Sequence, residues 1–391
     1  MPLLMIIRFV LSLLSWALLG AAAWLLWSWN QGEYVRDVDG VVHHIRHEWR
    51  LWTGLALLVW SFGGGNLLIR PFLARGDRDP LKPSRSHGEM IEGADGAHLY
   101  VETHGPVDAP CIVLTHGWGL DSTIWAYSKR ELGQDFRLVL WDLPGMGRSR
   151  PGRTGITLEA FAENLKRVIA FTGRDRVVLV GHSIGGMTVQ TLARDHADLF
   201  NRAVAGTVLV NTTYLDPLKT MVMSGLMQAL RPLIVMAMHL TVWLAPLAWL
   251  SAWQSYLNGS AHMANRLGFA GHVTHSQLGY TTLLTTRNSP AAQARGNLAM
   301  FRWNATGAMA QVATPVLVIA GDKDIVTKEE ASRAIVSQAR QAALEVVSDA
   351  NHMGFLARAG VYNPAIAAFA RRAFAGPVDS QTGASSLRDA G

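Results

Sequence analysis

Two long uncharged stretches before residue 70 place the strongest constraint on how this chain can fold. Neither Phe9 to Gly32 nor Leu51 to Ile69 contains an Asp, Glu, Lys or Arg residue. As a helix, the first stretch would be about 36 Å long, and the hydrocarbon core of a bilayer is about 30 Å thick. Neither stretch has the polar stripe of a surface helix. We therefore predict a membrane anchor of two transmembrane helices within residues 1–75.

Two other interpretations of these stretches stay open. The first could be a cleaved secretory signal that begins at Arg8 and has small residues at 20–23 for cleavage. Its apolar character continues through Trp29, which argues against cleavage. Both stretches could instead be buried helices of a soluble core. The whole chain is 49% hydrophobic and only 16% charged, whereas soluble proteins average about 25% charged residues, and this favours the membrane.

The basic residues that flank the stretches indicate an orientation. The loop between them holds more acidic than basic residues. The second stretch is followed by a basic linker, residues 76–87, and the basic side chains in and before it are Arg70, Arg75, Arg78, Lys82 and Arg85. Positive charge gathers on the cytoplasmic side of membrane proteins. We expect both ends of this helical hairpin, and the catalytic domain after it, to be cytoplasmic.

The overall charge narrows the range of partners. The net charge of +6 is modest, and we find no basic stripe or aromatic-basic motif for nucleic acid. We therefore expect membrane lipid as a partner and no nucleic acid. His43, His44 and His47 could suggest a metal site, but no acidic or cysteine partner has ligand spacing, and we interpret them as solvated loop residues. The oligomeric state stays open.

Beyond the linker, short β-branched runs alternate with helical patterns. A predicted hairpin at 89–104 precedes strands near 111–114, 138–140, 177–180, 207–210, 316–319 and 344–347, with helices near 157–172, after 183, and near 328–339 and 361–374. Such continuous apolar runs predict a mostly parallel sheet covered by helices on both faces. We assign 88–211 and 305–376 to this α/β core, 212–304 to a helical cap and 377–391 to a disordered tail.

Gly181-His182-Ser183-Ile184-Gly185 comes directly after one of these strands and before a helical pattern. In that setting Gly-x-Ser-x-Gly is typical of a tight turn that lifts a serine hydroxyl above the sheet. Glycines flank the serine because a Cβ there would collide with neighbouring chain. Ser183 is therefore the candidate nucleophile.

A serine nucleophile needs a base, and the base needs a carboxylate to orient it. Asp324 follows the predicted strand at 316–319, and His352 follows the strand at 344–347. All three side chains would then lie at the carboxyl edge of the sheet. Asp322 and Asp349 are competing acids that we interpret as turn or capping residues.

The loop after the 111–114 strand predicts an oxyanion hole. It reads Thr115-His116-Gly117-Trp118-Gly119, and the backbone N–H of Trp118 would pair with that of Ile184, the residue after the nucleophile. We interpret His116 and His182 as structural. Cys111 lies in a predicted buried strand, so we expect it to be inert.

These motifs together resemble the α/β-hydrolase fold family. The resemblance rests on 116–119, Asp142 to Ser149, Gly181 to Gly186, Gly321 to Asp324 and Asn351-His352, in that order. It covers about 88–375 and is nearest to the esterase, monoacylglycerol-lipase and haloperoxidase-like branch. Epoxide hydrolases and haloalkane dehalogenases of similar outline have an aspartate at the position of Ser183. The resemblance implies an α/β-hydrolase fold with a helical cap.

The predicted cap contains a charge-free segment from Pro232 to Asn265. It is long enough to be a third membrane span, but a single crossing would separate Ser183 from Asp324 and His352. We therefore expect a cap whose outer face dips into lipid, with a wholly internal cap as the alternative.

The hypothesis is a membrane-anchored serine hydrolase that cleaves carboxylic esters of lipophilic substrates, as an esterase or lipase, without a metal or organic cofactor. The same residues could serve thioester, amide or carbon–carbon hydrolysis, or cofactor-free perhydrolysis. A non-catalytic ligand-binding or scaffold protein on the same fold is the alternative from another class. Acyl length and the alcohol of the substrate stay open.

Overall fold

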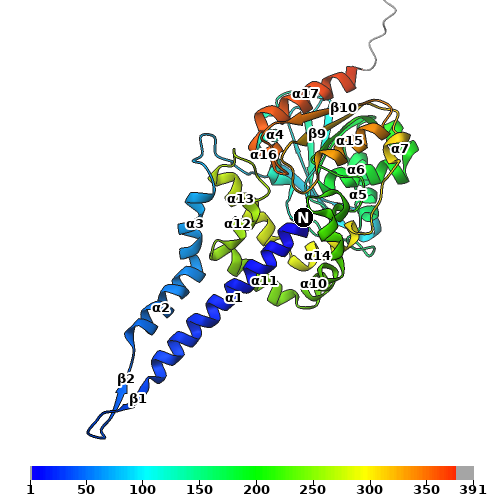
Figure 1. Cartoon of the computed structure of the whole chain (residues 1–391). Coiled ribbons are helices and arrows are strands. Elements are labelled where there is room, and N and C mark those ends of the chain that lie inside the picture. The colour runs from blue at the N-terminus through cyan, green and yellow to red at the C-terminus, as the bar shows by residue number, and fades with distance from the viewer. Residues whose placement is uncertain (1, 376–391) are drawn as a thin grey trace, which may run out of the picture.

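The computed structural model describes residues 2–375, and its first part is a long helical arm (Figure 1). The elements of the arm are α1 (Pro2–Gln31), β1 (Glu33–Arg36), β2 (Val42–Ile45), α2 (Glu48–Val59), a π-helical turn (Trp60–Gly64) and α3 (Gly65–Leu73). Figure 1 shows α2 beside α1, with β1 and β2 at the tip and α3 beside the body. The expected disordered tail, 377–391, lies outside the described residues.

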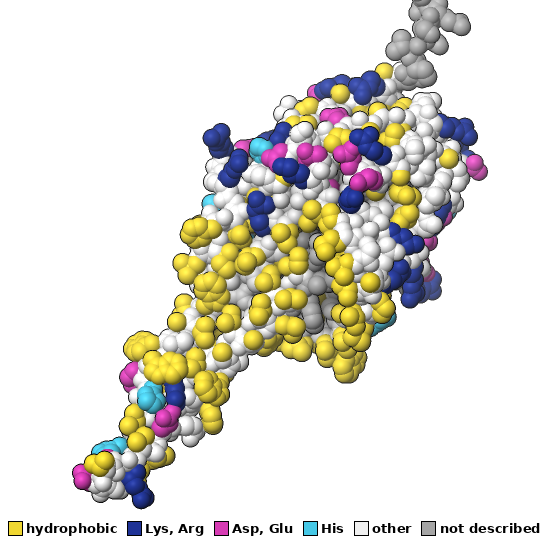
Figure 2. Space-filling view, in the orientation of Figure 1, with side chains coloured by type: hydrophobic (Ala, Val, Ile, Leu, Met, Phe, Trp, Pro, Cys, Tyr) yellow, Lys and Arg dark blue, Asp and Glu magenta, His cyan; other side chains and the backbone are white. Residues whose placement is uncertain are grey.

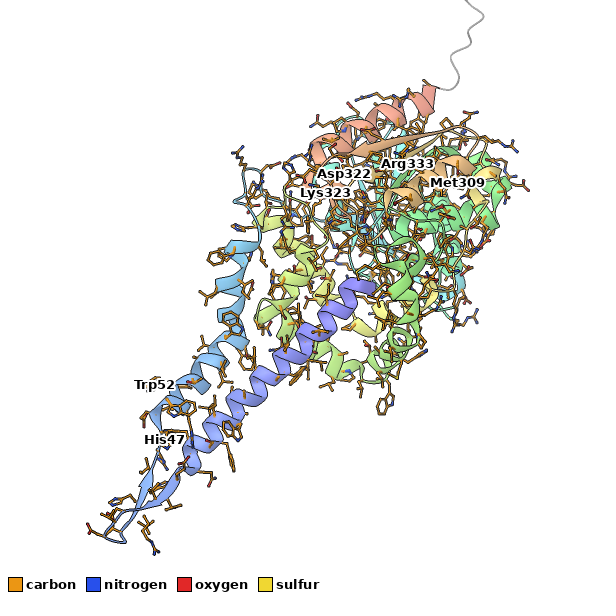
Figure 3. All side chains as sticks on the ribbon, viewed as in Figure 1. His47, Trp52, Met309, Asp322, Lys323 and Arg333 are labelled. Carbon is orange, nitrogen blue, oxygen red and sulfur yellow. The ribbon has the colours of Figure 1, made fainter. Side chains whose placement is uncertain are left out.

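Two segments of the arm, Val10–Gln31 and Glu48–Leu73, are long and apolar enough to cross a membrane. Only 17% of the most apolar window of each is buried inside the protein. Trp24, Trp27 and Trp52 are all more than half exposed, and Figure 3 shows Trp52 on the arm, away from Asp322 and Lys323 in the body. The soluble-core interpretation does not fit such exposure, and both segments are candidate spans.

The predicted loop between the spans is an antiparallel hairpin, β1–β2. His43 contacts Asp37 at 2.8 Å, and His47 contacts Glu33 at 3.4 Å. Within residues 2–375, no group of three or more His, Cys, Asp or Glu side chains could hold a metal ion.

The body is built on an eight-stranded sheet with the order β10-β9-β8-β7-β5-β6-β4-β3. The strands are β3 (His87–Glu92), β4 (His98–His104), β5 (Cys111–Thr115), β6 (Arg137–Trp141), β7 (Val177–His182), β8 (Val204–Val210), β9 (Val316–Gly321) and β10 (Ala342–Val347). Strands β5 to β10 pair in parallel, whereas β4 is antiparallel to both β3 and β6. This confirms the predicted mostly parallel sheet and its leading hairpin, although β3 begins one residue inside the expected linker.

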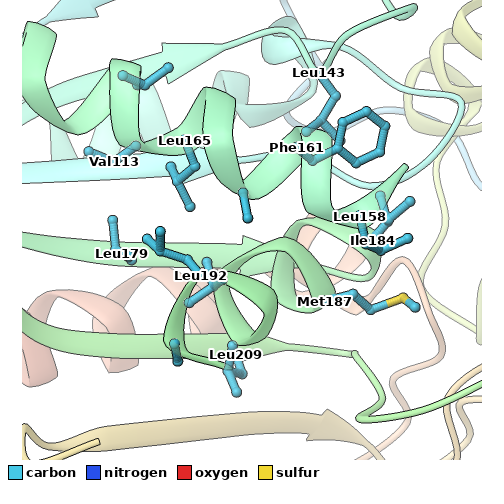
Figure 4. Close-up of a cluster of buried hydrophobic side chains, with 14 of the residues drawn as sticks. Val113, Leu143, Leu158, Phe161, Leu165, Leu179, Ile184, Met187, Leu192 and Leu209 are labelled. Atoms are coloured by element: carbon cyan, nitrogen blue, oxygen red, sulfur yellow. The ribbon is translucent and has the colours of Figure 1, made fainter. Parts of the chain in front are cut away.

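Helices cover both faces of the sheet because alternate strand residues point to opposite sides. They are α4 (Ala126–Leu132), α5 (Leu158–Phe171), α6 (Ile184–Asp195), α7 (Ala197–Ala203), α15 (Glu329–Gln338), α16 (Gly354–Ala357) and α17 (Ala359–Ala375), with 3-10 turns at Ala94–Gly96, Ser122–Trp125 and Ala308–Gln311. Val113 and Leu179 pack with Phe161 of α5 and Leu192 of α6 (Figure 4). Leu114 and Val180 face the other side, toward α4 and α17.

A helical insertion between β8 and β9 forms the cap. Its helices are α8 (Pro217–Thr220), α9 (Ser224–Ala229), α10 (Arg231–Trp243), α11 (Ala245–Leu257), α12 (Ser260–Arg266), α13 (His275–Arg287) and α14 (Pro290–Met300). The chain bends by 101° between α10 and α11, where Pro246 occupies the first turn of α11. The charge-free segment is therefore not one straight helix.

Candidate active site

The turn between β7 and α6 holds Ser183 in a strained conformation, with φ of 53° and ψ of −118°. Residues other than glycine rarely adopt a positive φ, and those that do cluster at functional sites. A Cβ on Gly181 would lie 2.5 Å from the carbonyl of Gly185, and one on Gly185 would overlap the carbonyl oxygen of Thr115. The Ser183 amide donates to the Val210 carbonyl at 3.0 Å. These close approaches confirm the prediction that a Cβ at either glycine would collide with neighbouring chain.

The structure brings Ser183, His352 and Asp324 together. The Oγ atom of Ser183 lies 3.0 Å from Nε2 of His352, and Nδ1 of His352 lies 3.0 Å from Oδ2 of Asp324. A carboxylate only accepts hydrogen bonds, so His352 donates from Nδ1, and its Nε2 is left to accept the serine proton. Exposure is 6% for Ser183 and 1% for His352. The three residues come from the carboxyl ends of β7, β9 and β10, as predicted.

The carboxylate of Asp324 is held ionised by its surroundings. Burial alone would raise its pKa, but the charge and hydrogen bond of His352, together with donors from Thr327 and Asn211, lower the pKa to about 2. Thr327 donates to Asp324 through its hydroxyl at 2.8 Å and its amide at 2.9 Å, and the Asn211 side chain donates at 2.9 Å. Asp324 is therefore a fixed negative charge beside His352.

The loop that carries Trp118 packs against the serine turn. A Cβ on Gly117 would overlap the ring of His182, and the first turn of α6 lies against Thr115. Ile184 is the first residue of α6, so its amide lies at a helix N-terminus. Within residues 2–375, neither the Trp118 nor the Ile184 amide donates a hydrogen bond. The role of these two amides as an oxyanion hole stays a prediction.

His116 and His182 are both buried and hydrogen-bonded to the backbone. His116 contacts the Gly117 carbonyl through Nδ1 and accepts from the Leu143 amide through Nε2. His182 contacts the His352 carbonyl at 3.0 Å. Burial, with a smaller contribution from His352, lowers the pKa of His182 to about 3. These contacts fit the structural roles that we predicted for both histidines.

The two competing acids lie in other contacts. Asp349 pairs with Lys323 at 2.6 Å and with His272 at 2.9 Å. Asp322 accepts from the Ala350 amide at 3.1 Å. Both therefore hold the loops around Asp324 and His352, as the sequence indicated.

Comparison with known families shows to which family the chain belongs. Residues 110–359 match the alpha/beta hydrolase fold family, which is more than half of the chain. The chain belongs to the α/β-hydrolase fold family. This confirms the family that the motifs indicated, whereas the esterase, monoacylglycerol-lipase and haloperoxidase-like branch stays a prediction.

Curated relatives of this α/β hydrolase match only part of it. A pimeloyl-[acyl-carrier protein] methyl ester esterase from Sodalis glossinidius is 41% identical over 112 residues, which cover 29% of this chain and 40% of that protein. The enzyme of the same name from Salmonella agona is 38% identical over 101 residues. The α/β hydrolase thus matches about 40% of the length of these relatives.

Solved structures resemble the hydrolase over most of its length. An esterase from Exiguobacterium antarcticum has a TM-score of 0.60 and 18% identity, and covers 73% of this chain and 100% of its own. A bromoperoxidase from Bacillus anthracis has the same TM-score, identity and coverage. At this identity the likeness shows the shared fold.

The hydrolase also contains site residues that we did not predict. Asn211 follows β8 at the same edge of the sheet, and its side chain is fixed by the Tyr362 hydroxyl at 3.0 Å. Thr212 donates to the Ser183 carbonyl at 2.7 Å. A search for polar residues directly after every predicted strand would have found Asn211. The sequence gives a weaker indication of Thr327, because its only distinguishing feature is its position three residues after Asp324.

The cap closes over the Trp118 loop. The Trp118 indole donates to the Gln293 carbonyl at 3.0 Å, and a Cβ on Gly119 would lie 3.3 Å from the methyl group of Thr285. Trp118 is only 4% exposed. Ser183 is almost as deeply buried, at 6% exposure.

Proposed function

We propose that this α/β hydrolase is a membrane-anchored serine esterase that cleaves carboxylic esters of lipophilic molecules through an acyl-enzyme. The observation that carries the proposal is the 3.0 Å contact between Ser183 Oγ and His352 Nε2, at a serine with φ of 53°. In this mechanism Ser183 is the nucleophile, His352 is the general base and Asp324 orients His352.

In the first half-reaction, Ser183 Oγ forms a bond to the ester carbonyl carbon while its proton passes to His352 Nε2. The resulting imidazolium is stabilised by Asp324, whose pKa is lowered to about 2. The tetrahedral intermediate then breaks its bond to the alcohol oxygen, which takes the proton from His352. The products of this step are a free alcohol and acylated Ser183.

In the second half-reaction, His352 removes a proton from water, and the hydroxide attacks the acyl carbon. The bond to Ser183 Oγ breaks, and the serine regains the proton from His352. The carboxylic acid leaves. The negative charge on the carbonyl oxygen in both steps would be bound by the Trp118 and Ile184 amides, and loss of one such donor typically slows a reaction by about 10²–10³.

Two observations support a site of action at a membrane, and a third supports an ester as the substrate. Two candidate spans precede the hydrolase, and exposed apolar side chains continue from them onto the cap (Figure 2). The curated relatives are named for a carboxylic ester, a methyl ester. The start of α1 and the end of α3 both lie beside the body, and the charged hairpin β1–β2 lies at the opposite tip of the arm. With the basic residues after α3, this favours a cytoplasmic hydrolase.

The proposal is tested with the full-length protein in detergent micelles and a panel of p-nitrophenyl esters of increasing acyl length. Ser183→Ala should abolish turnover and labelling by a fluorophosphonate probe. Ser337→Ala is the matched control, because that hydroxyl caps the end of α15 at the surface. Full turnover in the Ser183→Ala variant would disprove the mechanism, and an unlabelled, inactive wild-type protein would favour a ligand-binding or scaffold role.

A further inference from the structure

The turn between α11 and α12 is docked onto both helices of the arm at once. Ser15 of α1 contacts the Asn258 side chain, and its hydroxyl is 3.5 Å from that of Ser260. On the other side, a Cβ on Gly65 of α3 would overlap the Asn258 carbonyl oxygen. A Cβ on Gly259 would lie 3.0 Å from the Gly65 carbonyl oxygen. The backbones of the cap and the arm thus approach as closely as two glycines permit.

A second contact joins α1 to the middle of α11. The Trp16 indole donates to the Ser251 hydroxyl at 3.0 Å, and the Ser12 hydroxyl contacts the same oxygen. Polar side chains in hydrocarbon are expensive unless they pair with one another, and small polar residues are typical of helix contacts within membranes. Here Ser12 of α1 pairs with Ser251 of α11, and Ser15 lies 3.5 Å from Ser260 of α12, which is the kind of contact expected of an interface within the hydrocarbon.

These contacts fix the depth of the cap relative to the two candidate spans. Ser15 lies about 8 Å along the helix from Val10, the body end of the first span. Gly65 lies about 12 Å along the helix from Leu73, the body end of the second span. One leaflet of hydrocarbon is about 15 Å thick. Two independent helices therefore place Asn258 inside the leaflet nearer the body.

The outer surface of α10 and α11 has the composition that this depth requires. Its exposed side chains, which we call the cap apolar face, are Leu233, Met236, Leu240, Trp243, Leu247 and Leu250, each 45–78% exposed. No Asp, Glu, Lys or Arg occurs from Pro232 to Asn265, and His239 is the one exposed imidazole on these helices. Figure 2 shows a hydrophobic band over the arm and the adjoining body, with charged side chains at the tip and on the far part of the body.

We propose that α10 and α11 form a re-entrant membrane element, embedded in the acyl chains of the leaflet nearer the body and held there by the contacts with α1 and α3. The bend of 101° returns the chain to the side from which it came, which keeps Ser183 on the same side as Asp324 and His352. This inference rests on the proposed anchoring of the arm and deepens it. In this arrangement the cap apolar face contacts the acyl chains, where lipophilic esters dissolve.

Depth-dependent fluorescence quenching tests the proposal on the full chain in phosphatidylcholine nanodiscs. An environment-sensitive maleimide fluorophore is placed at Leu247→Cys on the cap, Trp24→Cys in the first span and Val107→Cys on the body. Val107 is 67% exposed in the loop before β5, at the sheet edge opposite the cap. The native Cys111 is buried, and burial raises the pKa of its thiol to about 11, so the parent protein serves as the labelling blank.

We expect spin-labelled lipids to quench Leu247→Cys and Trp24→Cys several-fold more than Val107→Cys, and aqueous iodide to quench only Val107→Cys. Iodide quenching at Leu247→Cys with lipid quenching at Trp24→Cys would overturn the re-entrant cap while leaving the anchor intact. Protection of Leu247→Cys from both quenchers would mean that a second copy covers the face, which also overturns it. Iodide quenching at Trp24→Cys would instead remove the anchor itself, and none of these readouts depends on esterase activity.

Discussion

The side-chain amide of Asn211 donates a 2.9 Å hydrogen bond to Oδ2 of Asp324, the same oxygen that contacts His352. Asn211 lies in the left-handed region, with φ of 44°, and the Tyr362 hydroxyl holds its carbonyl oxygen. The orientation of the carboxylate thus depends on the residue that follows β8 and on a residue of α17. Asn211 is a positioning residue that acts on His352 through Asp324.

Asn211→Ala should lower kcat for a short ester about tenfold, or about 1.4 kcal/mol, with little change in KM. The variant loses a hydrogen bond to a charged group, and such bonds contribute about 1.5–3 kcal/mol. The pKa of Asp324 should rise, because the carboxylate loses one of its hydrogen-bond donors. The control is Asn201→Ala, because that amide donates to the Gln311 carbonyl far from the site. An unchanged kcat would contradict the positioning role.

Acid should destabilise the protein through Asp324. Its pKa is about 2, below its ordinary value of 3.8, so the stabilisation is complete above about pH 4 and is lost as the pH falls through about 2. The contribution is about 2 kcal/mol at neutral pH. Thermal unfolding in detergent between about pH 5 and 2 should show a smaller loss of stability in Asp324→Asn than in wild type. Asp198→Asn, at an exposed site on α7, should unfold like wild type.

Relief of the backbone strain at Ser183 should raise the free energy of unfolding. Ser183→Gly and Ser183→Ala both remove the proposed nucleophile, but only glycine adopts φ of 53° without strain. Strain of this kind costs about 1–3 kcal/mol, which exceeds the roughly 0.4–1 kcal/mol that glycine loses through the unfolded chain. We expect Ser183→Gly to be more stable than Ser183→Ala by about 1 kcal/mol in matched thermal melts. Equal melting temperatures would show that the turn stores no strain.

The contact between the arm and the cap should be sensitive to one methyl group. Gly65→Ala places a Cβ against the backbone of Asn258, and overpacking of this kind costs about 1–3 kcal/mol. The variant should melt at a lower temperature and be cut faster by protease within the cap. Gly20→Ala in α1 is the control, because a Cβ there meets nothing within 4 Å. If both variants behave like wild type, the cap is not docked on α3.

The sequence was sufficient where the signal is local. The sheet could be predicted because its strands are continuous apolar runs. Ser183, Asp324 and His352 could be selected because each follows such a run within a few residues. The Gly181 and Gly185 positions could be read from one pentapeptide. The carboxyl ends of parallel strands lie at one edge of a sheet. The proximity of these three residues could therefore be predicted without knowledge of the tertiary contacts.

Tertiary structure decided what depends on contacts between distant segments. Asn211 and Thr327 meet Asp324 through the packing of β8 beside β9 and through a turn whose shape has no strong sequence pattern. The apolar content before residue 70 and from Pro232 to Asn265 could be read directly from the sequence, as two candidate spans and a charge-free insertion. That the two regions meet at Gly65 and Asn258 could not, because hydrophobicity states how much surface avoids water and not which surfaces touch.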